Sequence, residues 1–256
     1  MMLVFLIILV LIGVIMQNKN ILGVNLSLHT LREALNYSDY LMQNGALNTV
    51  HYISTRTLMQ ASKQAELKQL LESTDILICA ETDILRAAGI NSSARMYEIE
   101  NHLYLKELCR KIYHNNGQFC LLSDTEEGLQ TMKEIISGYL NESFTAVCQT
   151  LSKLRGSNDI LVPEVLANEL NDIAPTIILS NLPFSYQLQL MHELKPFLNA
   201  KMWIGLPSDM KLLIPPRHFS FSAFQKIWKK YFKKKVHQYQ NESEASDENN
   251  ARVVTK

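Results

Sequence analysis

The sequence predicts an α/β protein with a mostly parallel sheet and helices on both of its faces. Two observations lead to this prediction. Short apolar or β-branched runs alternate with longer stretches whose apolar residues recur every three or four positions. This alternation continues almost throughout the chain, which is typical of parallel sheets. The chain has 256 residues, and a chain of this length can bury a sizeable core.

The amino-terminal half of the pattern begins with a predicted strand at Ile21–Asn25 and a helix from Thr30. Thr30 and Glu33 stand three residues apart, which predicts a capping box at the start of that helix. The elements expected next are a strand at Val50–Ser54, a helix at Thr57–Leu71, a strand at Ile76–Ala80, a helix that starts near Asp83 and a helix at Tyr97–Asn115.

The carboxyl-terminal half continues the same alternation. Thr125, Glu126 and Glu127 suit the amino terminus of a helix, where acidic side chains face the positive end of the helix dipole. The expected elements are a strand at Gly117–Leu122, a helix at Thr125–Leu140, a strand at Thr145–Cys148, a helix at Pro163–Leu170, a strand at Thr176–Leu179, a helix at Tyr186–Leu194 and a strand at Lys201–Gly205.

The stretch Thr74–Gly89 carries the strongest functional signal. Its apolar run ends abruptly in Glu81-Thr82-Asp83. An acidic step at the carboxyl end of a strand lies where open α/β sheets hold their ligands. Glu81 and Asp83 are therefore candidate catalytic residues. The competing interpretation is that Thr82 or Asp83 only caps the following helix.

The distribution of charges and cysteines bears on which partners and metal sites the protein can have. The formal net charge is +0, but Arg217–Lys235 is basic without any acid, whereas Asn241–Asn250 carries only acidic charges. The four cysteines are scattered and form no C-x-x-C pair, which predicts free thiols in a reducing compartment and no zinc site. They are Cys79, Cys109, Cys120 and Cys148. The sequence has neither a Walker loop nor a G-x-G-x-x-G motif, and no cofactor is expected.

Both ends of the chain suggest contact with a membrane. Met1–Met16 is uncharged and apolar, so residues 1–18 are expected to form a short anchor, or else a buried first element. Lys19 favours a cytoplasmic body. Residues 217–240 predict a basic helix with an aromatic face at an anionic membrane surface. The residues expected at that surface are Lys226, Trp228, Lys229, Lys230, Tyr231, Lys233 and Lys234.

Two alternatives remain open for this basic helix. Its aromatic face could dock on the domain and leave the lysines in solvent. Nucleic-acid binding is disfavoured because the rest of the chain is neutral. The last segment, residues 241–256, has little apolar content and is expected to be disordered.

Several segments resemble the WecG/TagA/CpsF glycosyltransferase family, over about Ile21–Phe232. They are Ile21–Val24, Thr30–Leu35, Glu66–Leu71 and Thr74–Leu77. The resemblance implies a Rossmann-like fold and metal-independent transfer of an aminosugar, commonly N-acetylmannosamine. The donor would be a UDP-sugar, and the acceptor a polyprenyl-diphosphate-linked sugar at the cytoplasmic face of the cell membrane. Such transfer serves cell-surface polysaccharide synthesis.

The family's site motifs map onto altered residues. The Asp-Gly step that supplies the family's base falls on Ala80-Glu81, which leaves Glu81 as the base and Asp83 as the fallback. The Arg-x-x-Gly-x-Asp block keeps Arg95 and ends in Glu100, and the Thr-x-Asn block becomes Tyr52-Ile53-Ser54. The expected substrate-binding residues are Tyr52, Ser54, Arg95, Glu100, Asn181, Pro183 and Asp209.

Together these observations predict an anchor at 1–18, a glycosyltransferase-like domain at 19–216, a membrane-associating helix at 217–240 and a tail at 241–256. The substituted motifs leave a second interpretation open, in which the chain is a catalytically inactive relative that binds or scaffolds partners in the same pathway. Assembly into a homo-oligomer is also left open.

Overall fold

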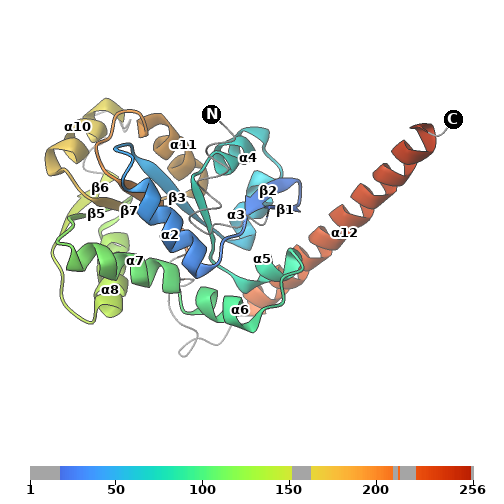
Figure 1. Cartoon of the computed structure of the whole chain (residues 1–256), viewed down its shortest axis with the longest axis horizontal. Helices are drawn as coiled ribbons and strands as arrows, with labels where there is room; N and C mark the ends of the chain where they lie inside the picture. Colours follow the sequence, from blue (N-terminus) through green and yellow to red (C-terminus); the bar gives the residue numbers. More distant parts are fainter. Residues whose placement is uncertain (1–17, 152–162, 210–212, 214–222, 255–256) are drawn as a thin grey trace.

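The computed structural model describes residues 18–151, 163–209, 213 and 223–254. Within these residues, six strands form one parallel sheet with helices on both faces, which confirms the predicted fold class (Figure 1). The expected anchor lies outside the described residues except for Asn18. In the part of the chain that is described, no helix combines the length and apolar content that a membrane crossing requires.

The sheet has the strand order β4-β3-β8-β7-β5-β6, and every neighbouring pair is parallel. Its strands read as nearly continuous apolar runs because helices cover both faces. All carboxyl ends therefore meet at one edge. The strands are β3 (Asn48–Ile53), β4 (Ile76–Cys79), β5 (Phe119–Ser123), β6 (Ala146–Thr150), β7 (Ile177–Asn181) and β8 (Met202–Gly205).

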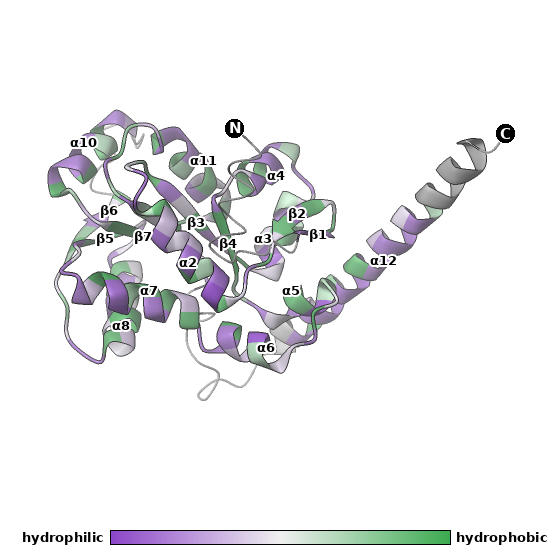
Figure 2. Cartoon of the chain, viewed as in Figure 1, coloured by the Kyte–Doolittle hydropathy of each residue, from purple (hydrophilic) through white to green (hydrophobic). Residues whose placement is uncertain are grey.

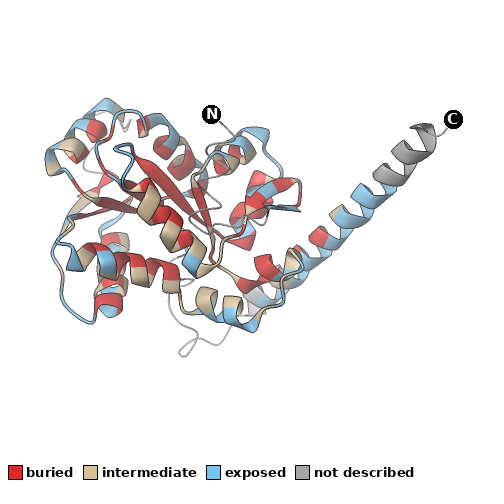
Figure 3. Cartoon of the chain, viewed as in Figure 1, coloured by how far each residue is buried: buried red, intermediate tan, exposed pale blue. Residues whose placement is uncertain are grey.

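The two faces of the sheet are covered by different helices (Figures 1 and 3). One face packs on α2 (Leu31–Leu41), α7 (Leu103–His114) and α8 (Glu126–Leu140). The other packs on α3 (Thr55–Ala61), α4 (Ala65–Glu72), α10 (Pro163–Ile173) and α11 (Phe184–Leu194). Figure 3 shows the strands buried between these layers except for the edge strand β6, in which only Thr150 is buried. The predicted capping box of Thr30 and Glu33 is present at the start of α2.

The predicted first strand, Ile21–Asn25, is wrong. This segment is an antiparallel hairpin of β1 (Asn18–Ile21) and β2 (Val24–Ser27). Leu22 and Gly23 form its turn, and both have positive φ, +55° and +79°. Two positive φ values are what a tight two-residue hairpin turn requires. Because Leu22 in the turn and the neighbouring Ile21 and Val24 are apolar, the segment has the sequence pattern of one continuous strand.

Two predicted helices are each divided in the structure. The stretch 57–71 forms α3 and α4 with a break at Ser62–Gln64. The stretch 97–115 forms α6 (Ser93–Glu100) and α7, separated at His102, whose φ is +50°. Across the first break the apolar periodicity continues because α3 and α4 contribute to the same core cluster, whereas α6 has no fully buried residue. After β4 the chain enters the short helix α5 (Thr82–Ala87).

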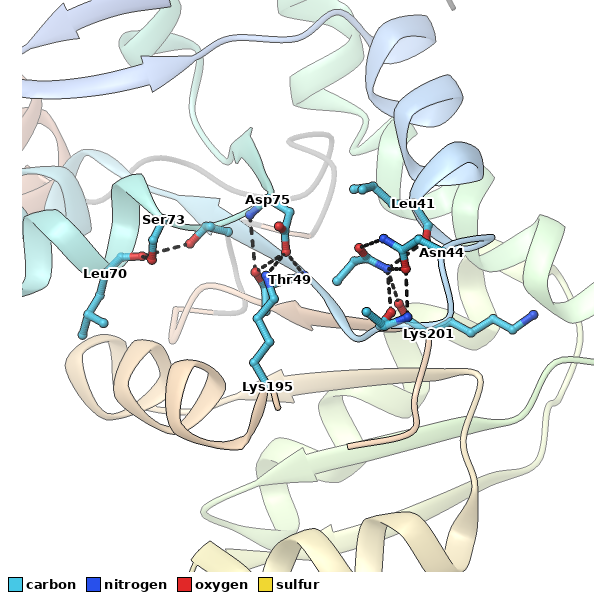
Figure 4. A network of polar contacts seen from close by, with 11 residues as sticks. Leu41, Asn44, Thr49, Leu70, Ser73, Asp75, Lys195 and Lys201 are labelled. Atoms are coloured by element: carbon cyan, nitrogen blue, oxygen red, sulfur yellow. Dashed lines mark hydrogen bonds and ion pairs between the residues drawn. The ribbon is translucent and has the colours of Figure 1, made fainter. Parts of the chain in front are cut away.

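The amino-terminal edge of the sheet is held by a polar network (Figure 4). Asp75 Oδ2 accepts hydrogen bonds from the Thr49 amide at 2.7 Å, from Thr49 Oγ1 at 2.8 Å and from Lys195 Nζ at 2.6 Å. Beside it, Asn48 Nδ2 donates to the carbonyls of Leu41 and Lys201. These groups satisfy one another's hydrogen-bonding capacity. Ligand-binding groups are therefore expected at the opposite, carboxyl-terminal edge of the sheet.

The carboxyl-terminal segment forms one long helix, α12 (Ala223–Val254), which runs away from the domain (Figure 1). Contrary to the predicted disordered tail, the helix continues through 241–254. It contains no Gly or Pro, and Gln238 Nε2 donates to Glu242 Oε1 one turn later at 3.1 Å. Figure 2 shows mostly hydrophilic residues along the coloured part of the helix beyond the domain, and residues 240–245 are exposed to solvent.

Candidate site at the carboxyl ends of β3 and β4

Glu81 lies directly beyond β4, at the N-cap position of α5. Its Oε1 accepts hydrogen bonds from the Thr55 amide at 2.9 Å and from Thr55 Oγ1 at 3.0 Å. Trp228 Nε1 of α12 donates to the same Thr55 hydroxyl at 3.1 Å. Burial raises the pKa of the Glu81 carboxyl, although the Thr55 hydrogen bonds act in the opposite direction. Glu81 is thus a partly desolvated carboxylate, and Thr55 fixes one of its two oxygens, Oε1.

Asp83 has a different environment, since its side chain is only 3% exposed. Its carboxylate pairs with Lys229 Nζ at 2.9 Å and with Arg86 Nη1 at 3.4 Å. Neither Asp83 nor Thr82 is the N-cap residue of α5, because Glu81 occupies that position without a capping hydrogen bond. Asp83 therefore holds two cations at the carboxyl end of β4.

The first turns of α12 dock on this part of the domain, beside α3 and α5. Phe232 and Val236 are buried, and Tyr239 lies against Gly23 of the β1–β2 turn. Of the alternatives left open for the basic helix, the structure shows the one in which its aromatic face docks on the domain. Of the residues expected at a membrane, Trp228 and Lys229 instead contact the domain. The remaining five are exposed beside Ile227: Lys226, Lys230, Tyr231, Lys233 and Lys234.

A pocket that is partly open to solvent lies beside β3 and β4. Its walls come from β3, β4, the segment that leads into α2, α6, and the start of α7. The residues that line it are Leu28, His29, Thr30, Leu31, Ala34, Tyr52, Leu77, Ile78, Cys79, Arg95, Glu98, Ile99, His102 and Tyr104. The structure therefore brings two predicted substrate-binding residues, Tyr52 and Arg95, into one site.

Arg95 forms one wall of this pocket. Its Nη2 donates to the carbonyl of His29 at 2.6 Å and to that of Leu28 at 3.2 Å. Its side chain forms no ion pair with any described residue, although Glu98 and Glu100 follow on the same helix. Glu98 instead accepts from the Leu31 amide at 3.2 Å, and Glu100 is exposed at the end of α6. Among the described residues, no carboxylate forms an ion pair with the Arg95 guanidinium.

Two side chains of the pocket carry buried polar atoms without a hydrogen-bond partner among the described residues. They are His29 through both ring nitrogens and His102 through Nδ1. Burial raises the pKa of Tyr52 well above its usual value, and it lowers the pKa of His102 to about 4. Burial also lowers the pKa of His29. Both imidazoles are therefore uncharged at neutral pH.

Sequence reasoning missed both of these histidines. His29 shows only a polar residue before a helix cap, and His102 marks a helix break that the continuous apolar pattern hides. Because His102 adopts positive φ, its position in the pocket depends on a backbone conformation that a single sequence does not reveal.

The other predicted residues lie elsewhere along the same edge. Ser54 caps α3 by accepting from the Thr57 amide at 3.1 Å. Asn181 ends β7, Pro183 is exposed at the start of α11, and Asp209 is exposed beyond β8. None of these four lines the pocket. Within the described residues, no group of three or more His, Cys, Asp or Glu side chains is placed to hold a metal ion.

A second buried network, which sequence reasoning also missed, positions the loops after β7 and β8. Gln187 Oε1 accepts from Ser180 Oγ at 2.9 Å and from the Leu182 amide at 3.2 Å, while Nε2 donates to the Leu206 carbonyl at 3.1 Å. A methyl group on Gly205 would lie 2.6 Å from Gln187 Nε2. The network therefore requires glycine at the end of β8.

Ala80 belongs to the same core cluster as Tyr52 and Ala34, which both line the pocket. Successive residues of a strand point to opposite faces. Glu81, the next residue, instead bonds Thr55 on the α3 side and does not line the pocket. The carboxylate and the pocket thus lie on two sides of the end of β4.

A family model described as "Glycosyl transferase WecG/TagA/CpsF family" matches residues 19–208. The match spans the parallel sheet, the pocket and the Glu81 segment, and it ends before α12. No curated protein is significantly similar to the chain.

Proposed function

The chain belongs to the WecG/TagA/CpsF glycosyltransferase family, and from this membership we propose that it transfers an aminosugar of the N-acetylmannosamine type. The donor is a UDP-sugar and the acceptor is a polyprenyl-diphosphate-linked sugar. The observation that supports this activity most is the environment of Glu81. It is a carboxylate at the carboxyl end of β4, with a pKa raised by burial and one oxygen fixed by Thr55.

In the proposed reaction, Glu81 accepts the proton of the acceptor hydroxyl through Oε2. The acceptor oxygen forms a bond to the anomeric carbon while the bond from that carbon to the UDP oxygen breaks. A general base works best when its pKa approaches the working pH, and burial moves the pKa of Glu81 in that direction. Thr55 uses only Oε1, which leaves the other oxygen available for the proton.

The departing UDP carries negative charge that a cation must stabilise. Arg95 suits this role because it lines the pocket and pairs with no carboxylate of the described residues. Lys229 and Arg86 do not line the pocket, and both already pair with Asp83. We therefore assign the diphosphate to Arg95, which requires donor and acceptor to meet across the end of β4, between the pocket and the Glu81 carboxylate.

A second function is favoured by the position of Ala80. The family's base motif maps to Ala80, and this residue lies in the core cluster beside the pocket, whereas Glu81 is turned toward α3. A displaced catalytic group can lower a rate by about a hundredfold. A relative that binds the sugar nucleotide without transferring the sugar, and acts as a partner in the same pathway, is consistent with this geometry.

We further propose that the protein works at the cytoplasmic face of the cell membrane. Exposed Ile227 and Tyr231 lie one helical turn apart on α12, among Lys226, Lys230, Lys233 and Lys234. Apolar and basic side chains on one exposed helix surface suit an anionic lipid interface. Each lysine near such a surface contributes about 1 kcal/mol at moderate ionic strength.

Two measurements on purified protein separate the transferase from the binding relative. Thermal unfolding with UDP-N-acetylmannosamine reports binding, because a ligand of the native state raises Tm by mass action. Radiolabelled transfer to a polyprenyl-diphosphate-linked N-acetylglucosamine acceptor reports catalysis. Binding with transfer supports the enzyme, binding without transfer supports the non-catalytic relative, and absence of both overturns the proposed donor.

A further inference from the structure

One edge of the six-stranded sheet is open to backbone pairing within the described chain. β6 ends the strand order and pairs with β5 alone, and no other described segment hydrogen-bonds to its backbone. The opposite edge strand, β4, instead packs beside β2 of the hairpin. A strand at an edge presents a row of unpaired N–H and C=O groups, to which another strand can bind.

β6 lacks the features that usually protect an edge strand from other chains. Residues 143–151 contain no charged residue and no proline, and the register between β5 and β6 runs without a bulge. Val147 is 42% exposed, and Thr150 is the one buried residue of the strand. Charged side chains, proline and bulges are the means by which edge strands avoid pairing with another chain. Their absence from β6 indicates an edge that pairs in the assembled protein.

The exposed apolar side chains at this edge lie on one face of the sheet. Val147 is in register with Cys120, and residues in register on neighbouring strands point to the same face. Cys120 shares a core cluster with Leu166 of α10, so Val147 points to the α10 face. α10 exposes Val165, which is 44% exposed, and Figure 1 shows this helix at the end of the molecule that carries β6. Apolar area on this face favours association.

We propose that two copies of this chain associate through β6, in an antiparallel pair that continues the sheet of one protomer into that of its partner. A twofold axis perpendicular to the sheet relates the copies, so each edge meets an identical edge. The register that pairs every residue of Ala146–Thr150 is centred on Cys148 and sets Val147 opposite the partner's Gln149. Because the edge is uncharged, the copies meet without the repulsion of like charges that lie directly opposite.

Cys148 reports on this pairing in the full-length protein. It is partly exposed, whereas the other three cysteines are buried. Residues directly opposite in an antiparallel pair have Cα atoms about 4.5–5.5 Å apart, a separation that a disulfide spans. Oxidation of the protein in mild detergent with copper–phenanthroline and dissolved oxygen should therefore give a covalent dimer on a non-reducing gel. Cys148→Ser should give none.

Charge variants test the register. Changing both Val147 and Gln149 to Lys sets lysines opposite lysines, and should lower the cross-linked fraction about tenfold or more. Changing both to Glu should have the same effect. A mixture of the two variants should restore the cross-link, because each lysine then lies opposite a glutamate. Tyr97→Lys is the matched control, since Tyr97 is 61% exposed on α6, and it should leave cross-linking unchanged.

Wild-type protein by itself can overturn the inference. Absence of a cross-link through Cys148 would do so, and so would a dimer in light scattering that Cys148 does not cross-link, because such a dimer uses another surface. Equal cross-linking in wild type and the double-lysine variant, or no restoration on mixing, would equally exclude the β6 pair. None of these readouts depends on sugar transfer, so the inference is tested separately from the proposed function.

Discussion

Lys229 of α12 places its ammonium group 2.9 Å from the buried carboxylate of Asp83, at the carboxyl end of β4. One residue earlier on the helix, Trp228 donates to Thr55, the residue that also holds Glu81. The carboxyl-terminal helix and the proposed base therefore share a single hydrogen-bonded group. Docking of α12 and the geometry of the site are coupled through Thr55.

Replacing Lys229 by Met should destabilise the protein. The change leaves the Asp83 carboxylate, 3% exposed, with only Arg86 at 3.4 Å. Removing one partner of a buried ion pair costs more than removing an exposed charge, and since Lys229 is partly exposed we expect a loss of about 1–3 kcal/mol in the free energy of unfolding. Urea denaturation measures it. Lys230→Met, at the next and exposed position, is the control, and equal stability of the two variants would contradict the assigned pair.

Gly205→Ala should disrupt the network beneath the loops after β7 and β8. The added methyl group would lie 2.5 Å from His51 Nδ1 and 2.6 Å from Gln187 Nε2. Overpacking of this kind costs about 1–3 kcal/mol. Gly138→Ala is the matched control, because nothing lies within 4 Å of its new methyl group and helix α8 should gain about 0.5–1 kcal/mol. Thermal denaturation that ranks the two variants in the reverse order would refute this packing.

Stability should fall on acidification below about pH 6.5. Burial lowers the pKa of His51 to about 3 and that of His102 to about 4. Between the usual value of 6.5 and these values the unfolded chain binds more protons than the native state. Each histidine therefore lowers the free energy of unfolding by up to about 1.4 kcal/mol per pH unit as pH falls through this window. Urea titrations at pH 7, 6 and 5 measure the slope.

The matched variants for this pH effect are His102→Asn and His114→Asn. The first removes one of the buried imidazoles and should make the dependence on pH shallower, whereas the second changes an exposed histidine. Identical slopes in wild type and His102→Asn would show that His102 does not titrate as described.

Membrane binding should depend on the exposed lysines of α12 and not on Lys229. In a protein that lacks residues 1–16, changing Lys226, Lys230, Lys233 and Lys234 to Gln should weaken binding to anionic vesicles by at least tenfold, since each contributes about 1 kcal/mol. Lys229→Gln should have a smaller effect because Lys229 pairs with Asp83. Sedimentation with phosphatidylglycerol and phosphatidylcholine vesicles measures it. Retention of the fourfold variant on anionic vesicles would exclude this surface as the contact.

The sequence was most informative where a local pattern determines structure by itself. The capping box of Thr30 and Glu33, and the strand that ends before Glu81, were both predicted and are both present. It was least informative where the backbone needs positive φ. The Leu22–Gly23 turn and the His102 break each lie within an apolar pattern that continues through them.

Long-range packing explains the remaining differences. The repeat of aromatic residues on α12 predicted two faces of a helix, but it could not tell whether lipid or the domain covers the aromatic face. Burial of Phe232 and the bond from Trp228 to Thr55 show that the domain does. His29 and Arg95 meet in the pocket because α6 folds against the segment before α2, a contact between residues far apart in the chain.

The rate of aminosugar transfer by Glu81→Gln tests the central claim most directly. Gln can still accept the Thr55 hydrogen bonds, so the fold and UDP-N-acetylmannosamine binding should persist, whereas the proton acceptor is lost. Transfer to the polyprenyl-diphosphate-linked acceptor is measured under single-turnover conditions, with the exposed Glu134→Gln as control. We predict that Glu81→Gln lowers the rate by about 10²–10⁴ while the control does not. Equal rates in wild type and Glu81→Gln would contradict the assignment of Glu81 as the base.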